Sequence, residues 1–458
     1  MSRAGPCRCG RKGRGRDGGP RDAMKWISTR GHSPPISFVD ALFAGTAPDG
    51  GLYMPERLDP LPAAALESLR HADIVEVATT IGAHLLRDEI SRAALEPLVR
   101  DALDFPLPVV RVTGRISVLE LFHGPTLAFK DVGARVQARL LHHFTDGTPL
   151  TILVATSGDT GSAVAQAFHR VPDARVVVLY PEGQVTDVQE AQMASMGDNI
   201  TAVAVRGTFD DCQRLVKRAF ADDALRGHVW LTPANSINLG RLLPQVFYYF
   251  LLARLVPVGP DRGGEGLVVS VPSGNFGNLT AGLIAKRLGL PVRRFVAGTN
   301  VNDAVPAYLQ SGRYEPKPSV RTVANAMDVG APSNFERVQA LYSGDLTALR
   351  RDVVGFAYGD DRVTEEIGRV YRQDGYLLDP HSAIAWLALE DYLRADATAQ
   401  GVLLATAHPG KFREVVEPAI GAAVDLPPTL AAALARPRHT VSMPADYAAL
   451  EQFLRAVH

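Results

Sequence analysis

Lys130 is the residue whose setting most needs a chemical explanation. It ends the apolar stretch of "HGPTLAFKD" (residues 123–131) and opens a helix-like segment, "VGARVQARLLHHF". A lysine normally keeps its ammonium in water, so one interpretation is a side chain whose stem packs while its head reaches solvent. The other is a deprotonated amine that acts as a nucleophile or base, which desolvation and nearby positive charge promote.

Three strand-loop-helix units accompany this lysine. They are "LTILVATSGDTGSAVAQAF" from residue 150, "GLVVSVPSGNFGNLTAGLIAKRLGL" from residue 266 and "GVLLATAHPGKFREVVEPAI" from residue 401. Short apolar strands that alternate with helices predict an α/β fold whose parallel strands are covered by helices on both faces. Ligands of such sheets bind beyond the carboxyl ends of the strands, where the three loops lie.

The glycine-rich loops predict an anion site. A loop that enters a helix presents free backbone N–H groups and the positive end of the helix dipole, and both favour a phosphate or carboxylate. None of the loops matches the Walker pattern or G-x-G-x-x-G. Together with Lys130 they indicate an anion-binding α/β enzyme with a lysine nucleophile. The best-known chemistry of that kind is a Schiff base to pyridoxal phosphate.

Composition and charge limit the class of protein. The chain has 458 residues, 46% of them hydrophobic and 21% charged, which is typical of a soluble globular protein with two or three domains. A formal net charge of -1 offers no basic surface for nucleic acid. With no apolar run of about 18 residues we expect no membrane span. Three cysteines argue against a disulfide framework, and we expect a cytoplasmic protein.

The first 23 residues differ from the rest of the chain. They carry seven Lys or Arg against two Asp and almost no large apolar residue. We therefore expect a disordered, dispensable basic extension, with Met24 as an alternative start. A nucleic-acid arm is the other interpretation. Cys7 and Cys9 have no neighbouring ligand pair, so we expect no metal.

Eight motifs follow in order along the chain. They are "DGGLYMPE", "HGPTLAFKD", "ATSGDTGSA", "ANSINLGRLLPQ", "VPSGNFGNLTAG", "TNVND", "NAMDVG" and "TAHPGKF". Their order resembles the threonine synthase family, within the tryptophan-synthase-β-like (fold type II) pyridoxal-phosphate enzymes. The resemblance extends from about residue 24 to the C-terminus and leaves out the basic extension.

The resemblance implies two parallel-sheet α/β domains of fold type II, an N-terminal helical domain and pyridoxal 5'-phosphate bound between the α/β domains. We expect the extension at 1–23 and the mainly helical domain at 24–110. The α/β domain with Lys130 and the substrate loop should follow at 111–257. The α/β domain with the cofactor-phosphate loop and the C-terminal tail should occupy 258–458, and "PVGPDRGGEG" (257–266) is the expected linker.

The implied reaction converts O-phospho-L-homoserine and water to L-threonine and phosphate, by γ-elimination and β-addition. It is the last step of threonine biosynthesis, catalysed by a carbon–oxygen lyase. A small-molecule substrate is then the expected partner, and both a monomer and a homodimer remain open. One alternative is a serine/threonine dehydratase-like lyase with the same cofactor, which would release a keto acid. The other is a non-catalytic binding protein of the same fold.

The resemblance also implies roles for individual residues. Lys130 would hold the cofactor and move protons, and Thr406 would face the pyridine nitrogen. Arg241 and Lys411 would bind the substrate phosphate, although both also suit solvated helix-face charges. Asp159 is awkward beside an anionic substrate and would accept a loop hydrogen bond or pair with a cation. The cofactor-phosphate loop comprises Ser273, Gly274, Asn275, Phe276, Gly277 and Asn278. The substrate set comprises His123, Ser157, Asp159, Thr160, Asn238, Arg241 and Lys411.

Overall fold

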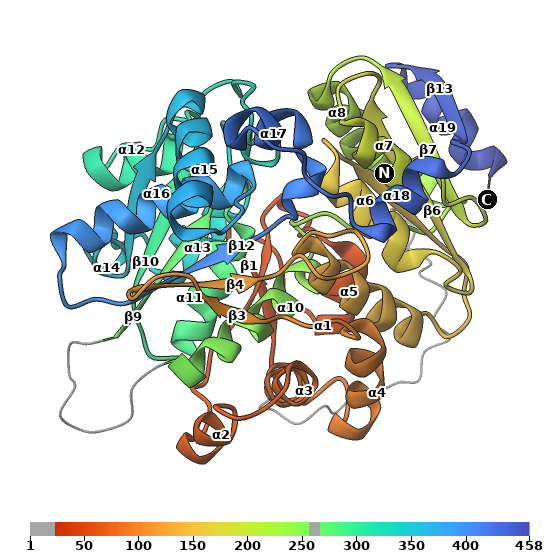
Figure 1. Ribbon diagram of the computed structural model, residues 1–458. Coiled ribbons are helices and arrows are strands. Elements are labelled where there is room, and N and C mark those ends of the chain that lie inside the picture. Colours follow the sequence, from red (N-terminus) through yellow and green to blue (C-terminus); the bar gives the residue numbers. More distant parts are fainter. Residues whose placement is uncertain (1–22, 256–265, 458) are drawn as a thin grey trace.

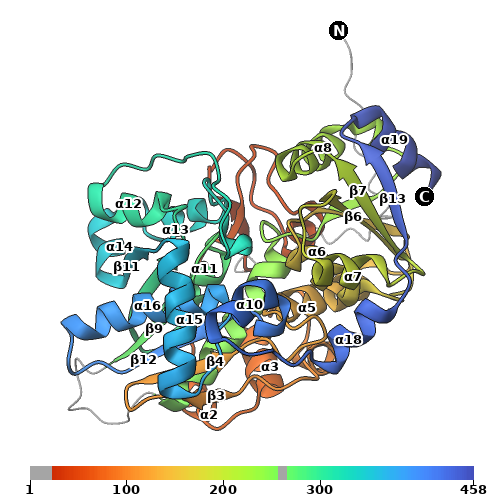
Figure 2. The ribbon, with the colours of Figure 1, turned by 45° about the horizontal axis from the view of Figure 1, so that its top comes forward.

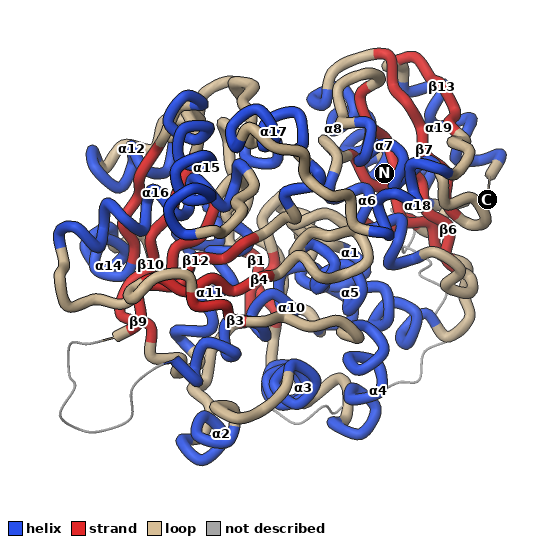
Figure 3. Tube along the Cα trace, viewed as in Figure 1, coloured by secondary structure: helices blue, strands red, loops and turns tan. Residues whose placement is uncertain are grey.

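The computed structural model describes residues 23–255 and 266–457. The expected basic extension (1–23), apart from its last residue, and most of the expected linker (257–266) lie outside these ranges. Two sheets dominate the described chain (Figure 1). Figure 3 shows their strands as two separate groups, with the helices α5 and α10 near the middle of the molecule.

The larger sheet has six strands in the order β11-β10-β9-β12-β4-β3. Its neighbouring strands run parallel, except that β3 is antiparallel to β4. Every residue of β9 and β12 is buried, as expected for a parallel sheet with both faces covered. The strands are β3 (Val109–Arg111), β4 (Ile116–Glu120), β9 (Leu267–Pro272), β10 (Val292–Thr299), β11 (Val353–Ala357) and β12 (Gly401–Ala405).

The smaller sheet has five strands in the order β13-β7-β6-β5-β8, and all of its pairings are parallel. All residues of β5 are buried. The two sheets therefore confirm the expected α/β fold with parallel strands. The strands are β5 (Leu150–Ala155), β6 (Ala174–Pro181), β7 (Ile200–Arg206), β8 (Leu231–Pro233) and β13 (Thr440–Pro444).

Helices connect the strands of both sheets. No helix in the described ranges is long and apolar enough to cross a membrane. The helical elements between β4 and β9 are α5 (Lys130–Thr145), α6 (Asp159–Phe168), α7 (Asp187–Ala194), α8 (Phe209–Ala221), α9 (Asp223–Arg226), α10 (Leu239–Phe250) and η1 (Leu251–Leu255). Those after β9 are α11 (Gly277–Arg287), α12 (Ala304–Ser311), η2 (Asn325–Met327), α13 (Phe335–Leu341), α14 (Leu346–Asp352), α15 (Asp360–Asp374), α16 (Pro380–Ala395), η3 (Pro409–Lys411), α17 (Arg413–Ile420), α18 (Pro428–Ala435) and α19 (Tyr447–Ala456).

The two faces of the five-stranded sheet pack into different cores. Ile152 of β5 belongs to the central core, which also contains Ala163 of α6. Its neighbour Leu153 packs in a separate core with Leu215 of α8. Successive residues of a strand point to opposite faces, so the continuous apolar run of β5 follows from burial on both sides.

The N-terminal region is mainly helical, as the sequence predicts. Ser37, Asp73 and Ser91 accept backbone N–H groups at the starts of three of its helices. Trp26 packs on Phe38 with ring centroids 5.4 Å apart. The elements are β1 (Trp26–Ser28), α1 (Phe38–Ala44), β2 (Tyr53–Pro55), α2 (Ala63–Ser68), α3 (Ile74–Leu85) and α4 (Arg92–Ala102).

Two strands pair outside the sheet that their place in the chain suggests. β4 lies beside β12 in the six-stranded sheet, with Val118 opposite Leu403, although its residues fall in the range expected for the other α/β domain. β13 belongs to the five-stranded sheet beside β7, where its parallel pairing covers an otherwise open edge. Figure 2 shows β13 beside β7 and far from the six-stranded sheet. Sheet membership depends on long-range pairing, which the order of motifs does not reveal.

Candidate active site

The loops at the carboxyl ends of β5, β9 and β12 face one cavity of about 2530 Å³. β9 and β12 are parallel neighbours, so their loops leave the same edge of the six-stranded sheet, whereas the loop after β5 enters the cavity from the five-stranded sheet. The cavity thus lies between loops of the two sheets. Most of the predicted site residues line this cavity. They are Lys130, Ser157, Asp159, Thr160, Arg241, Ser273, Gly274, Asn275, Phe276, Gly277, Asn278 and Thr406.

Lys130 is the first residue of α5, and main-chain bonds fix its position. The Phe129 N–H donates to the Thr406 carbonyl over 2.8 Å, which ties the lysine loop to the end of β12. The Lys130 side chain is only 16% exposed. Burial lowers the pKa of Lys130, nearby Asp159 opposes that effect, and the positive charges of Lys411 and Arg241 lower the pKa further. The neutral, nucleophilic amine is therefore more accessible than in an exposed lysine.

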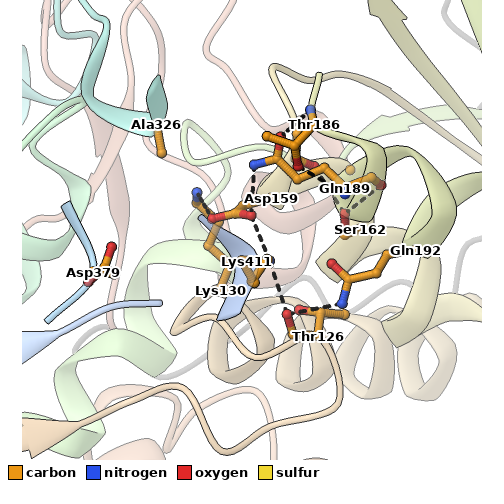
Figure 4. A network of polar contacts seen from close by, with 12 residues as sticks. Thr126, Lys130, Asp159, Ser162, Thr186, Gln189, Gln192, Ala326, Asp379 and Lys411 are labelled. Atoms are coloured by element: carbon orange, nitrogen blue, oxygen red, sulfur yellow. Dashed lines mark hydrogen bonds and ion pairs between the residues drawn. The ribbon is translucent and has the colours of Figure 1, made fainter. Parts of the chain in front are cut away.

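Asp159 lies between two lysine side chains (Figure 4). Its Oδ2 is 3.6 Å from Lys130 Nζ, and its Oδ1 is 2.6 Å from Lys411 Nζ. Gln189 Nε2 also donates to Oδ1 over 3.1 Å. Burial alone raises the pKa of Asp159, but the two lysines outweigh that effect and hold the pKa well below its usual range. Of the two roles that the sequence leaves open, Asp159 takes the pairing with cations.

The turn before α6 requires a glycine. Gly158 has φ +139°, and a Cβ atom there would lie 2.3 Å from the Gln189 side chain. Thr156 Oγ1 accepts the N–H groups of Gly158 and Gly161, over 2.9 and 2.8 Å. This turn brings Ser157 and Thr160 to the cavity surface at the N-terminus of α6.

The loop after β9 enters α11 without any basic side chain. Phe276, in a left-handed conformation with φ +59°, precedes the first residue of the helix. A Cβ atom on Gly274 would lie 2.8 Å from the backbone of Met327, so the two chain segments approach closely there. The Asn275 amide binds Ser236 Oγ over 2.7 Å and the Ser333 N–H over 2.6 Å. Asn275 therefore braces the loop, and its side chain is committed to protein partners.

Asn278 has a buried donor that lacks a protein partner. Its Oδ1 accepts the hydroxyls of Tyr248 and Tyr249 over 2.6 and 2.7 Å, lengths typical of O–H···O bonds. The carbonyl side of the amide therefore faces the tyrosines and the NH₂ faces away from them. Nδ2 is buried without a hydrogen-bond partner among the described residues. Such a donor costs about 1–3 kcal/mol unless a ligand accepts it.

These donors fit the phosphate of pyridoxal phosphate. The orphaned amide of Asn278, the loop N–H groups and the N-terminus of the 11-residue helix α11 all favour an anion at this place. The lysine amine that the cofactor's aldehyde needs lines the same cavity.

Three predicted residues do not line the cavity. His123 Nε2 contacts Glu120 Oε2 at 2.6 Å, and its side chain is 34% exposed. Asn238 begins α10: its Oδ1 accepts the Gly240 N–H over 2.8 Å and its Nδ2 donates to the Leu42 and Pro233 carbonyls. Lys411 is fully buried and bonded to Asp159. His123 Nε2, both side-chain amide atoms of Asn238 and Lys411 Nζ thus have protein partners, and Lys411 is not the solvated charge considered above.

Two groups of cavity residues are not among the site residues predicted from the sequence. Asn235 and Ser236 line the cavity just before α10, and His381 lines it at the start of α16. His381 Nδ1 lies 2.6 Å from Asp379 Oδ2, and its Nε2 accepts the Ala326 N–H over 3.2 Å. "DPHS" reads as an ordinary helix start with a capping aspartate and a proline, so the sequence gives no separate signal for this histidine.

Comparisons with known proteins define first the class and then the family. A family model described as "Pyridoxal-phosphate dependent enzyme" matches residues 110–407, so the chain is a pyridoxal-phosphate-dependent enzyme. Models described as "Threonine synthase N terminus" and "Threonine synthase, C-terminal" match residues 25–103 and 382–454. The threonine synthase of Escherichia coli (strain K12) is 44% identical over 432 residues, which are 94% of this chain and 99% of that protein.

Solved structures agree with this assignment. The E. coli threonine synthase structure has a TM-score of 0.88 at 43% identity and covers 95% of this chain and 100% of its own. A PLP-bound threonine synthase from Brucella melitensis has a TM-score of 0.88 at 37% identity, covering 95% and 99%. The chain belongs to the threonine synthase family, and its cofactor is pyridoxal phosphate.

Proposed function

We propose that the chain converts O-phospho-L-homoserine and water to L-threonine and phosphate. The observation that carries this proposal is a buried lysine amine in one cavity with two separate groups of anion donors, one around Asn278 and one around Arg241. Such a cavity suits a phosphorylated cofactor together with a phosphorylated substrate.

The cofactor's phosphate belongs at the loop Ser273 to Asn278. When bound, pyridoxal phosphate withdraws electrons from the substrate carbons near its amino group. Lys130 would hold the cofactor through its amine and would hold or move protons at the substrate's Cα, Cβ and Cγ. Thr406, which lines the cavity at the end of β12, would face the ring nitrogen with a neutral hydroxyl, and this would leave more of the proton transfer to Lys130.

Arg241 is the proposed ligand of the substrate phosphate. Its guanidinium lines the cavity, where Nη1 donates to the Ala234 carbonyl over 2.5 Å, and Nε has no hydrogen-bond partner within the described ranges. Burial lowers the pKa of Arg241 to about 10, so the group stays charged at neutral pH. Asn235 and Ser236, on the same surface, add neutral donors. A dianion that leaves from Cγ is stabilised by such a fixed cation.

The substrate carboxylate is assigned to the start of α6. Ser157 and Thr160 supply hydroxyls there, and the N-terminus of the helix favours a negative charge. The charge of Asp159 does not repel the carboxylate strongly, because Lys411 compensates it at 2.6 Å. Closure of the cavity over the substrate would exclude water until the addition step. A cytoplasmic location, and a monomer or homodimer, stay predictions.

The test is to incubate the purified holoenzyme with O-phospho-L-homoserine and to measure threonine and phosphate. Equal amounts of both products are expected. Ammonia and a keto acid in place of threonine would favour the dehydratase-like alternative. A protein without a visible cofactor band and without product would support the non-catalytic alternative.

A further inference from the structure

Lys411 is a charged side chain that no ligand in the cavity can reach. It lies in η3, its side chain is 0% exposed, and it does not line the cavity. Its Nζ donates to the Thr126 carbonyl over 3.0 Å and pairs with Asp159 Oδ1 at 2.6 Å. A role in binding the substrate phosphate therefore does not explain this lysine.

The two lysines contact different oxygens of Asp159 (Figure 4). Lys411 and Gln189 both bind Oδ1, whereas Oδ2 faces Lys130 at the longer distance of 3.6 Å. A carboxylate carries one negative charge and can balance only one ammonium. The shorter contact assigns that charge to Lys411. Asp159 therefore stabilises the ammonium form of Lys130 less than it would if Lys411 were absent.

Other charged groups around Lys130 do not replace this counter-ion. Arg241 adds a second positive charge. His381 contributes to lowering the pKa of Asp159, and its own Nδ1 is hydrogen-bonded to Asp379. Asp131, next in the chain, accepts the Thr126 N–H and hydroxyl over 2.8 and 2.6 Å, and burial raises its pKa to about 6. No salt bridge other than that with Asp159 involves Lys130 in the described part of the chain.

We infer that Lys411 is the fixed counter-ion of Asp159, and that this pair keeps the Lys130 amine available for bond formation. Lys411 is thus a positioning residue that acts through Asp159, and it touches neither substrate nor cofactor. This inference rests on the proposed role of Lys130 as the reactive amine.

Two substitutions should act on Lys130 in opposite directions. Lys411→Met leaves Asp159 with Lys130 as its only cation, which stabilises the ammonium form of Lys130. Asp159→Asn leaves two neighbouring ammonium groups without a carboxylate, which favours the neutral amine. The double variant Lys411→Met/Asp159→Asn removes one charge of each sign and should behave nearly like the unsubstituted chain.

The experiment measures the reactivity of the Lys130 amine directly. Full-length chain freed of cofactor is treated briefly with a small acylating reagent over a range of pH, and modification of Lys130 is quantified by peptide mass spectrometry. Relative to the unsubstituted chain, the pH midpoint should rise by about one unit or more in Lys411→Met and fall in Asp159→Asn. Lys286→Met, which breaks a Lys–Asp pair of 2.7 Å elsewhere in the molecule, should leave the midpoint unchanged.

A purely structural role for Lys411 would not produce shifts of opposite sign. Midpoints that stay fixed or move together, in variants with native circular dichroism, would overturn the inference. If Lys411→Met does not fold, the other two variants decide. The midpoint should fall in Asp159→Asn and should return close to that of the unsubstituted chain in the double variant. The labelling needs no turnover, so it separates this inference from the proposed reaction: normal threonine formation without the shifts rejects only the role of Lys411.

Discussion

The loop before α11 and the cluster around Lys130 face the same cavity but handle charge in opposite ways. The loop, residues 273–278, has no ionisable side chain and offers only backbone N–H groups and the Asn278 amide. The cluster holds Lys130, Asp159 and Arg241, which line the cavity, and Lys411, which pairs with Asp159 and does not line it; all four are largely buried.

This difference matches the tasks of the two regions. Neutral donors do not titrate, so the loop can hold a phosphate with the same donors over a wide range of pH. Buried charges depend on one another, so each of them changes the protonation of its neighbours. A region that anchors a cofactor profits from the first arrangement, and a region that tunes a reactive amine needs the second.

The largest expected effect comes from removing the reactive amine. Lys130→Ala should abolish the covalent cofactor band in the visible spectrum and lower the rate of threonine formation by more than about 10³-fold, because no other amine takes over the proton transfers. Absorbance spectra and product assays check this. A variant that keeps its band would show that another lysine holds the cofactor.

Arg241→Met should have the next largest effect. Loss of the fixed cation should lower kcat/KM for O-phospho-L-homoserine by about 10²- to 10³-fold, while the Kd of pyridoxal phosphate changes little. Arg241→Lys keeps a positive charge but not the guanidinium fork, so its kcat/KM should lie between those of the unsubstituted chain and Arg241→Met. Steady-state kinetics and cofactor titration separate these effects. An equal loss in cofactor affinity would contradict the division of the cavity into two anion sites.

Asn278→Ala tests the neutral side of the comparison. Loss of the amide should weaken pyridoxal phosphate binding by about 10- to 100-fold, since hydrogen bonds to charged groups are worth about 1.5–3 kcal/mol. Tyr248→Phe removes one hydroxyl that orients the amide, and should weaken binding less. Equilibrium titration of the cofactor-free chain measures both. A dependence on pH that differs from that of the unsubstituted chain would contradict a cradle of neutral donors.

Thr406→Asp should give the smallest change in rate. A carboxylate facing the ring nitrogen would stabilise the protonated form of that nitrogen, with the proton taken up from solvent, which should shift the visible absorbance and change the proportion of substrate that leaves as keto acid. Turnover should fall by less than about tenfold, because only one hydrogen bond is exchanged. Spectra and product ratios test this. If neither changed, the assignment of Thr406 to the ring nitrogen would be wrong.

The local parts of this molecule can be predicted from the sequence. The apolar strands at residues 150, 267 and 401 are each followed by a small-residue loop and a helix, and the structure has all three units. Local spacing specifies such units because strand and helix periodicity depend on near neighbours.

Long-range pairing is what the sequence does not reveal. The pairing of Lys411 with Asp159 depends on how η3 packs against α6, and both residues read equally well as loop charges. The motif places Asn238 at the same position whether it caps α10 or binds a ligand. Only its bonds to the Leu42 and Pro233 carbonyls show that the side chain is used within the protein. β4 joins its sheet by register with β12, which no motif encodes.

The most direct test of the central claim is to identify the lysine that carries the cofactor. The holoenzyme is reduced with borohydride and digested, and the peptide with the added pyridoxyl phosphate is mapped by mass spectrometry. Lys130 should carry the label and Lys411 none, because Lys411 is buried against Asp159 outside the cavity. A label on Lys411, or on any lysine other than Lys130, would contradict the account.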